Sequence, residues 1–145
     1  MKLDIQGVIK ALDAVGRSLA ENKDYLTELD SAIGDADHGI NMNRGFQKVH
    51  DRLTAGSYAD LGAVLKDVGM TLMGSVGGAS GPLYGTMFMK MSSRLAGREE
   101  LDTPSLAEAV EEGLKGIVAL GRANLQDKTM VDSLTPAVEA LKRAA

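Results

Sequence analysis

Residues 5–21 read IQGVIKALDAVGRSLAE, and apolar side chains recur through this stretch every three or four positions. The apolar positions share one face of a helix: Ile5, Val8, Ile9, Leu12, Val15 and Leu19. The charged residues Lys10, Asp13 and Arg17 fall on the opposite face. This spacing predicts an amphipathic helix that buries one face and exposes the other.

The same periodicity continues along the rest of the chain. Alternating β-branched runs, which are typical of strands, do not occur. Thr103 and Pro104 predict a helix start, with Thr103 as the cap and Pro104 at the first helical position. The chain is therefore predicted to be a single all-α domain over residues 1–145, with six or so helices. Further apolar stripes of helical spacing fall in residues 25–29, 42–53, 61–72, 83–95, 106–118 and 134–141.

Composition excludes several classes of function. The 145 residues are enough for one domain, and only 3% of them are aromatic. The net charge of -4, with no basic lobe, argues against nucleic acid as a partner. The absence of cysteine excludes disulfides, thiolate metal sites and a cysteine nucleophile. No secretory signal or membrane span is recognisable, because the uncharged stretch 68–89 is rich in glycine, so a cytoplasmic location is expected.

An acidic segment is the strongest candidate for chemistry. Asp30, Asp35 and Asp37 fall within eight residues around Gly34. Clustered carboxylates repel one another unless a cation neutralises them, and hard oxygen ligands of this kind suit Mg²⁺ with a bound phosphate. The alternative is that these aspartates are turn and capping residues, because their side chains accept hydrogen bonds from nearby backbone.

A second candidate is the glycine-rich segment Gly77–Pro82. Small residues allow the backbone to approach a ligand, and a helix that starts here would direct free N–H groups at a phosphate. The alternative is a tight turn between helices, since Gly77, Gly81 and Gly85 at four-residue spacing also fit close helix packing. No P-loop or dinucleotide-binding fingerprint occurs in the sequence.

The histidines and methionines indicate less about function than these two segments do. His50 is expected at the surface, whereas His38 either contacts a ligand or is satisfied by the backbone. Met130 lies in a polar connection, where it could cover a flat ligand. Five other methionines are expected to fill the core: Met70, Met73, Met87, Met89 and Met91.

Three segments together resemble a known family. Residues 34–46, 77–86 and 127–130 are similar, in this order, to the nucleotide-binding subunits of dihydroxyacetone kinase, called DhaL. The resemblance implies an antiparallel helical barrel that binds ADP or ATP and two Mg²⁺ ions at one end. It assigns Asp30, Asp35 and Asp37 to the metal. It assigns eight residues to the nucleotide: His38, Gly39, Ile40, Asn41, Ala79, Ser80, Gly121 and Met130.

The resemblance also implies partners. Dihydroxyacetone is held by a separate kinase subunit, and ADP stays bound and is rephosphorylated by a phosphotransferase-system protein. Because Met1 leads almost directly into the first helix, we expect no preceding sugar-binding domain, which favours the multi-subunit system. Two alternatives remain: a related kinase that phosphorylates a fatty acid or another ketose, and a non-catalytic helical adaptor.

The chain departs from the family at its C-terminal end. Family members continue past this point with further helices and another nucleotide-contacting loop, whereas this sequence ends at Ala145. We therefore expect a barrel that lacks its C-terminal helices and exposes apolar helix faces. Self-association into a homo-oligomer, or marginal stability of the chain alone, is the expected consequence.

Overall fold

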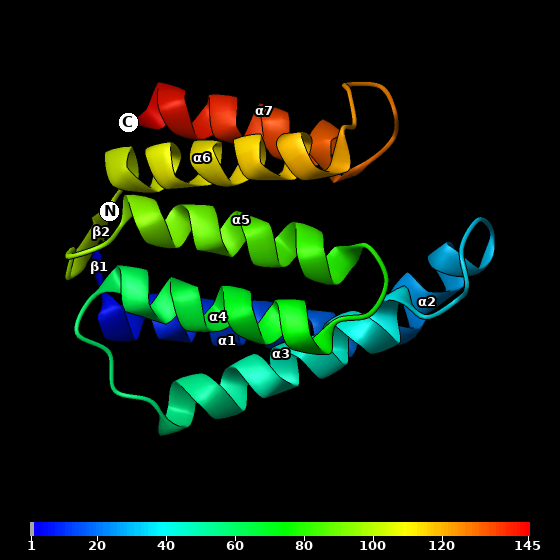
Figure 1. Ribbon diagram of the computed structural model, residues 1–145, viewed down its shortest axis with the longest axis horizontal. Coiled ribbons are helices and arrows are strands. Elements are labelled where there is room, and N and C mark those ends of the chain that lie inside the picture. The colour runs from blue at the N-terminus through cyan, green and yellow to red at the C-terminus, as the bar shows by residue number, and fades with distance from the viewer. Residues whose placement is uncertain (1) are drawn as a thin grey trace.

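Seven helices run up and down in the computed structural model, which describes residues 2–145 (Figure 1). Each helix packs beside its neighbours in the chain from α3 to α7, and α1 packs against α3. The all-α prediction is confirmed, with one helix more than the estimate of six. The helices are α1 (Ile5–Glu21), α2 (Lys23–Ser31), α3 (His38–Ala55), α4 (Leu61–Ser75), α5 (Ser80–Arg94), α6 (Thr103–Gly121) and α7 (Met130–Ala144).

A short strand pair joins two segments that lie far apart in sequence. β1 (Lys2–Asp4) runs antiparallel to β2 (Glu100–Asp102), with Leu3 opposite Leu101. The prediction of no strands is therefore wrong at this point. Three residues are too few to display the alternating pattern by which a strand is recognised in a sequence.

Side-chain caps fix where four of the helices begin. Asp4 accepts a hydrogen bond from the Gly7 N–H at 2.7 Å, and Asp60 accepts one from the Ala63 N–H at 2.7 Å. Thr129 and Asp132 form a capping box at the start of α7. α6 is capped by Asp102, which accepts from the backbone N–H at position 105 at 2.8 Å. The predicted cap, Thr103, is instead the first helical residue, because the aspartate one position earlier satisfies the free N–H.

The core is aliphatic and centres on α4. Leu61, Val64 and Leu72 are at 0% exposure between the neighbouring helices. Met91 is buried with them, and Met87 and Met89 are half-buried. Met70 and Met73, however, are 58% and 43% exposed, so their predicted place in the core is wrong. Both lie outside the stripe that α4 buries, where a methionine replaces a polar residue without disturbing the packing.

Three connections meet at one end of the molecule. Residues 32–37, 76–79 and 122–129 join successive helices at the end opposite the strand pair (Figure 1). α3 begins at His38, so the polar residues up to Asn43 form its first turns, ahead of most of the apolar stripe predicted over residues 42–53. No helix among residues 2–145 is both long and apolar enough to cross a membrane.

Candidate metal and phosphate site

The three aspartates converge at the end where these connections meet. Asp30 lies near the end of α2, Asp35 in the following loop and Asp37 directly before α3. One carboxylate oxygen from each lies within 4.8 Å of the other two. An octahedral Mg²⁺ with bonds of about 2.0–2.1 Å places its ligand atoms about 2.9–4.2 Å apart. The three carboxylates therefore have the chemistry that a divalent cation needs, and their oxygens lie near the spacing that it requires.

The backbone of the loop holds Asp30 in place. Its Oδ2 accepts hydrogen bonds from the N–H groups of Asp37 at 3.0 Å and His38 at 3.3 Å. Gly34 passes so close that a Cβ there would lie 2.1 Å from Asp30 Oδ1. Ala36 adopts the left-handed conformation, with φ of 60°, which tightens the turn. Asp30 thus has a structural role in the loop as well as an oxygen close to those of the other two carboxylates.

The electrostatics of the cluster are unbalanced. The N–H of Asp37 lowers the pKa of Asp30 by stabilising its carboxylate. Asp35 shows the reverse: a hydrogen bond and repulsion from the Asp37 side chain raise the pKa of Asp35. Within residues 2–145, no lysine or arginine forms an ion pair with any of the three. A turn that served only as a cap would not need this repulsion, which a cation would relieve.

The glycine-rich segment lies beside the acidic loop. The hydroxyl of Ser80 lies 3.3 Å from Nδ1 of His38, and the backbone of Gly77 lies against the Asn41 amide. Asn41 is buried, with 6% exposure. His38 and Asn41 from the start of α3 therefore lie against the glycine-rich segment at the start of α5, whereas Gly39 packs against Lys23 of α2.

Two of the helices that begin at this end, α3 and α5, are not capped in the usual way. The N-cap residues of α3 and α5, Asp37 and Ala79, make no side-chain hydrogen bond to the first turn. In α3 the first N–H donates to Asp30 instead. Unbonded N–H groups at a helix start attract anions, which suits a phosphate beside the cation.

The glycines in and after the glycine-rich segment serve two purposes: some allow close packing and one allows the turn. A Cβ on Gly81 would lie 2.3 Å from the Val76 carbonyl, and one on Gly85 would lie 2.2 Å from the Met73 side chain. These two glycines therefore permit close helix packing, as one of the alternatives predicted. Gly78, with φ of 64° and nothing within 4 Å of its Cβ position, serves the turn.

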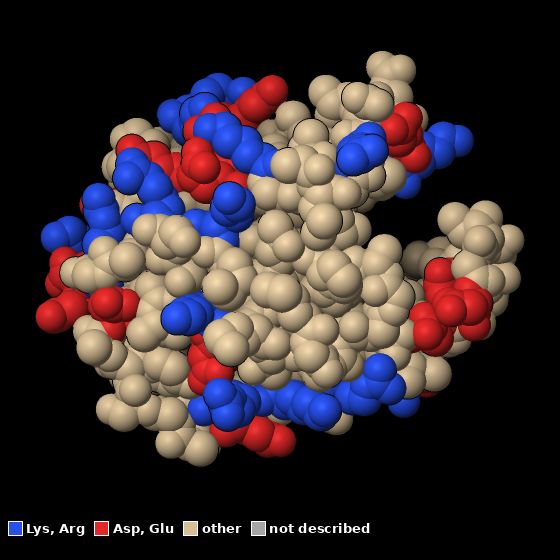
Figure 2. Space-filling model, in the orientation of Figure 1, with Lys and Arg blue, Asp and Glu red and all other residues tan. Residues whose placement is uncertain are grey.

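The remaining predicted residues lie at the same end of the molecule. Gly121 is the last residue of α6 and Met130 the first of α7. Figure 2 shows an open hollow at this end of the molecule. A group of acidic side chains lies on one side of the hollow, across from the part of the molecule that forms its other side. Ile40 is 49% exposed in the first turn of α3. The structure thus brings His38 and Ser80 into contact, whereas Gly121 and Met130 lie on α6 and α7.

Sequence reasoning missed one residue of this site. Arg44 donates a hydrogen bond from Nη2 to Asn41 Oδ1 at 2.6 Å and another from Nε to the Ser75 carbonyl at 3.1 Å. The only signal in the sequence was an arginine one helical turn after Asn41, on the same face of the helix.

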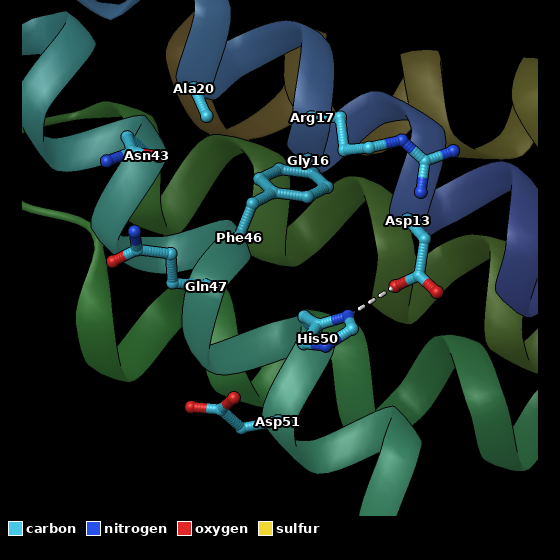
Figure 3. A pocket seen from close by; sticks show the side chains of 9 residues that line it. All are labelled: Asp13, Gly16, Arg17, Ala20, Asn43, Phe46, Gln47, His50 and Asp51. Carbon is cyan, nitrogen blue, oxygen red and sulfur yellow. Dashed lines mark hydrogen bonds and ion pairs between the residues drawn. The ribbon is translucent and has the colours of Figure 1, made fainter.

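Another hollow of the molecule lies away from this site. It has a volume of about 530 Å³ and runs between α1 and α3, with Phe46 between the two helices (Figure 3). The Asp13 carboxylate lies 2.9 Å from His50 Nδ1 at its edge. His50 is 59% exposed, which agrees with the surface position expected for it. None of the acidic-loop or glycine-segment residues lines this hollow.

Comparison with known proteins places the chain in a family. A profile described as the DAK2 domain matches residues 32–145. The chain belongs to the DAK2 family. This DAK2 domain is 43% identical over 145 residues to the ADP-binding subunit DhaL of the PEP-dependent dihydroxyacetone kinase from Escherichia coli strain K12, and spans 69% of that subunit. The resemblance seen in the sequence is thereby confirmed.

Two further relatives point to the same family. The DAK2 domain is 44% identical over 130 residues to the ADP-binding subunit DhaL of the PTS-dependent dihydroxyacetone kinase from Lactococcus lactis, covering 90% of this chain and 65% of that subunit. It also resembles the crystal structure of the C. freundii dihydroxyacetone kinase in complex with AMP-PNP and Mg²⁺. That likeness has a TM-score of 0.83 at 25% identity and covers 97% of this chain and 26% of the other.

Proposed function

We propose that this DAK2 domain is the ADP-binding subunit of a dihydroxyacetone kinase, with residues 1–145 acting as one nucleotide-binding unit. The observation that carries the proposal is the convergence of three carboxylates, with oxygens within 4.8 Å, beside the uncapped start of α5. Phosphoryl transfer depends on positioning and on neutralising phosphate charge more than on covalent chemistry by the protein. A site of this kind meets that need without a P-loop.

Each residue of the site has a distinct task in this proposal. Asp30, Asp35 and Asp37 hold Mg²⁺, which when bound neutralises phosphate charge. His38, Gly39, Ile40 and Asn41 form one wall of the nucleotide site, and Ala79 and Ser80 form the phosphate-facing turn. Gly121 and Met130 form the opposite wall of the nucleotide site. The backbone N–H groups at the start of α5 orient the phosphates.

The acceptor and the donor come from other proteins in this proposal. Dihydroxyacetone is held by a partner kinase subunit, and a phosphotransferase-system protein rephosphorylates the bound ADP. The names of the Escherichia coli and Lactococcus lactis relatives support this choice. A related kinase with a fatty acid or another ketose as acceptor would use the same nucleotide site, so an acceptor assay with the partner subunit distinguishes it.

Calorimetric titration with ADP tests the nucleotide site. We expect binding with Mg²⁺ present and a loss of binding with EDTA, because the phosphate would then face three unneutralised carboxylates. Asp35→Asn should weaken Mg²⁺-dependent binding and abolish phosphoryl transfer. The matched control is Asp24→Asn on α2, whose carboxylate is 95% exposed and pairs with Lys23.

The outcomes separate the candidate functions. ADP binding that ignores EDTA would make the aspartates structural and contradict the kinase mechanism. No phosphoryl transfer by the wild type in any partner assay, together with an Asp35→Asn variant that keeps wild-type partner binding, would favour the helical adaptor.

A further inference from the structure

Arg44 bridges the two segments that form the candidate site. It lies on α3, and its guanidinium reaches both the Asn41 side chain of its own helix and the carbonyl of Ser75 on α4. Ser75 is the last residue of α4, and residues 76–79 follow it directly as the connection to α5. One side chain therefore ties the nucleotide wall at the start of α3 to the origin of the glycine-rich turn.

The bond to Asn41 decides which way the Asn41 amide points. Arg44 can only donate hydrogen bonds, so the atom that it contacts must be the amide oxygen. The amide as a whole lies against the glycine-rich turn, where a Cβ on Gly77 would lie 3.0 Å from its nitrogen and 3.3 Å from its oxygen. Asn41 is 6% exposed, so its amide has little freedom to turn over. Arg44 therefore fixes the orientation of a side chain that packs directly on the turn.

The bond to Ser75 serves a second purpose. The last four carbonyls of a helix lack partners within the helix, and the negative end of the helix dipole attracts a cation there. The Arg44 guanidinium supplies both a donor and a positive charge to the end of α4. It thus fixes the point from which residues 76–79 depart.

We propose that Arg44 is a positioning residue for the nucleotide site, acting through Asn41 and through the origin of the 76–79 turn. This inference rests on the proposed function for its effect on nucleotide, and it goes beyond that function by naming the residue that aligns the two walls. The two hydrogen bonds require the fork of a guanidinium, so lysine cannot reproduce both.

Arg52 provides a matched control. It lies two turns further along α3 and joins the same helix pair through a 2.9 Å ion pair with Asp67 of α4. It lies toward the end of α3 that is remote from the acidic loop. Loss of Arg52 therefore removes a comparable link between α3 and α4 without touching Asn41 or residues 76–79.

The experiment compares Arg44→Lys, Arg44→Ala and Arg52→Ala in two measurements. In titrations of ADP with Mg²⁺, we expect Arg44→Ala to weaken binding by about ten- to a hundredfold, the usual range for a residue that supports ligand groups. Arg44→Lys should recover part of that loss, and Arg52→Ala should bind like the wild type. In an Asn41→Ala background, Arg44 can act only through residues 76–79. Arg44→Ala should therefore weaken ADP binding less in that background than it does in the wild type.

The second measurement needs no nucleotide. Amide hydrogen exchange of residues 76–79 should accelerate in Arg44→Ala and stay unchanged in Arg52→Ala. Unchanged exchange in Arg44→Ala would overturn the positioning role, whatever the titration gives. Equal loss of ADP affinity in Arg44→Ala and Arg52→Ala would also overturn it, because a general loosening of α3 on α4 would then suffice. Wild-type protein that fails to bind ADP, with the exchange result as expected, would overturn the proposed function and leave Arg44 as an anchor of the turn alone.

Discussion

The Ser80 hydroxyl lies 3.3 Å from Nδ1 of His38, although 42 positions separate the two residues in sequence. This contact joins the start of α3 to the start of α5 at the end of the molecule where the three aspartates meet. It makes one site out of two segments that each had a structural explanation when considered alone. The acidic loop and the glycine-rich turn are therefore parts of a single surface.

A double-mutant cycle on His38 and Ser80 tests whether this contact is energetically real. We expect the effects of His38→Ala and Ser80→Ala on the free energy of unfolding to be non-additive by about 0.5–1.5 kcal/mol, the net value of one hydrogen bond. Urea denaturation of the four proteins measures this coupling. Strictly additive effects would mean that the two side chains do not interact in solution.

The repulsion within the aspartate cluster predicts a pH dependence of Mg²⁺ binding. Asp37 raises the pKa of Asp35, so folded protein holds this proton more tightly than the unfolded chain does. The contribution of Asp35 to the free energy of unfolding therefore falls as the pH rises from the ordinary pKa of 3.8 through the raised one. Mg²⁺ must displace this proton, so its affinity should increase from about pH 4 to pH 7.

Thermal unfolding with and without Mg²⁺ measures that dependence. At neutral pH, metal-free Asp35→Asn should melt at the same temperature as the wild type or higher, because the substitution removes repulsion. It should also lose the rise in Tm that Mg²⁺ gives the wild type. A metal-free Asp35→Asn protein that is clearly less stable than the wild type would show that Asp35 supports the fold itself.

The close approach of α3 to α2 predicts that Gly39 tolerates no side chain. A Cβ at this position would lie 1.9 Å from the Lys23 carbonyl, so Gly39→Ala must push the start of α3 away from α2. We expect a loss of about 1–3 kcal/mol in the free energy of unfolding, typical of overpacking. Gly74→Ala is the matched control, since nothing lies within 4 Å of its Cβ position. A control as unstable as Gly39→Ala would refute the steric argument.

The central position of α4 predicts where the core is sensitive. Leu72 is fully buried, so Leu72→Ala should lower the free energy of unfolding by about 2–5 kcal/mol. Met70, two residues away on the same helix, is 58% exposed, and Met70→Ala should change it by less than about 0.5 kcal/mol. Chemical denaturation of both variants checks the contrast, which similar losses would contradict.

Much of the fold could be predicted from the sequence because helices are local. Apolar residues three and four positions apart marked α1, α3, α4, α5 and α6. The same locality made Asp30, Asp35 and Asp37 recognisable as a cluster, since only eight positions span them. The similarity of three segments to one family then connected this cluster to the glycine-rich turn.

What the sequence by itself determined is thus the helices and the chemistry of each loop, because hydrogen bonds and side-chain spacing within a few residues settle these. Only the tertiary structure decided that β1 pairs with β2, that Met70 faces solvent, and that Arg44 reaches the end of α4. Each of these depends on residues that lie tens of positions apart. Such contacts form only when the packing of one helix on the next fixes both partners in space, and no local pattern records that choice.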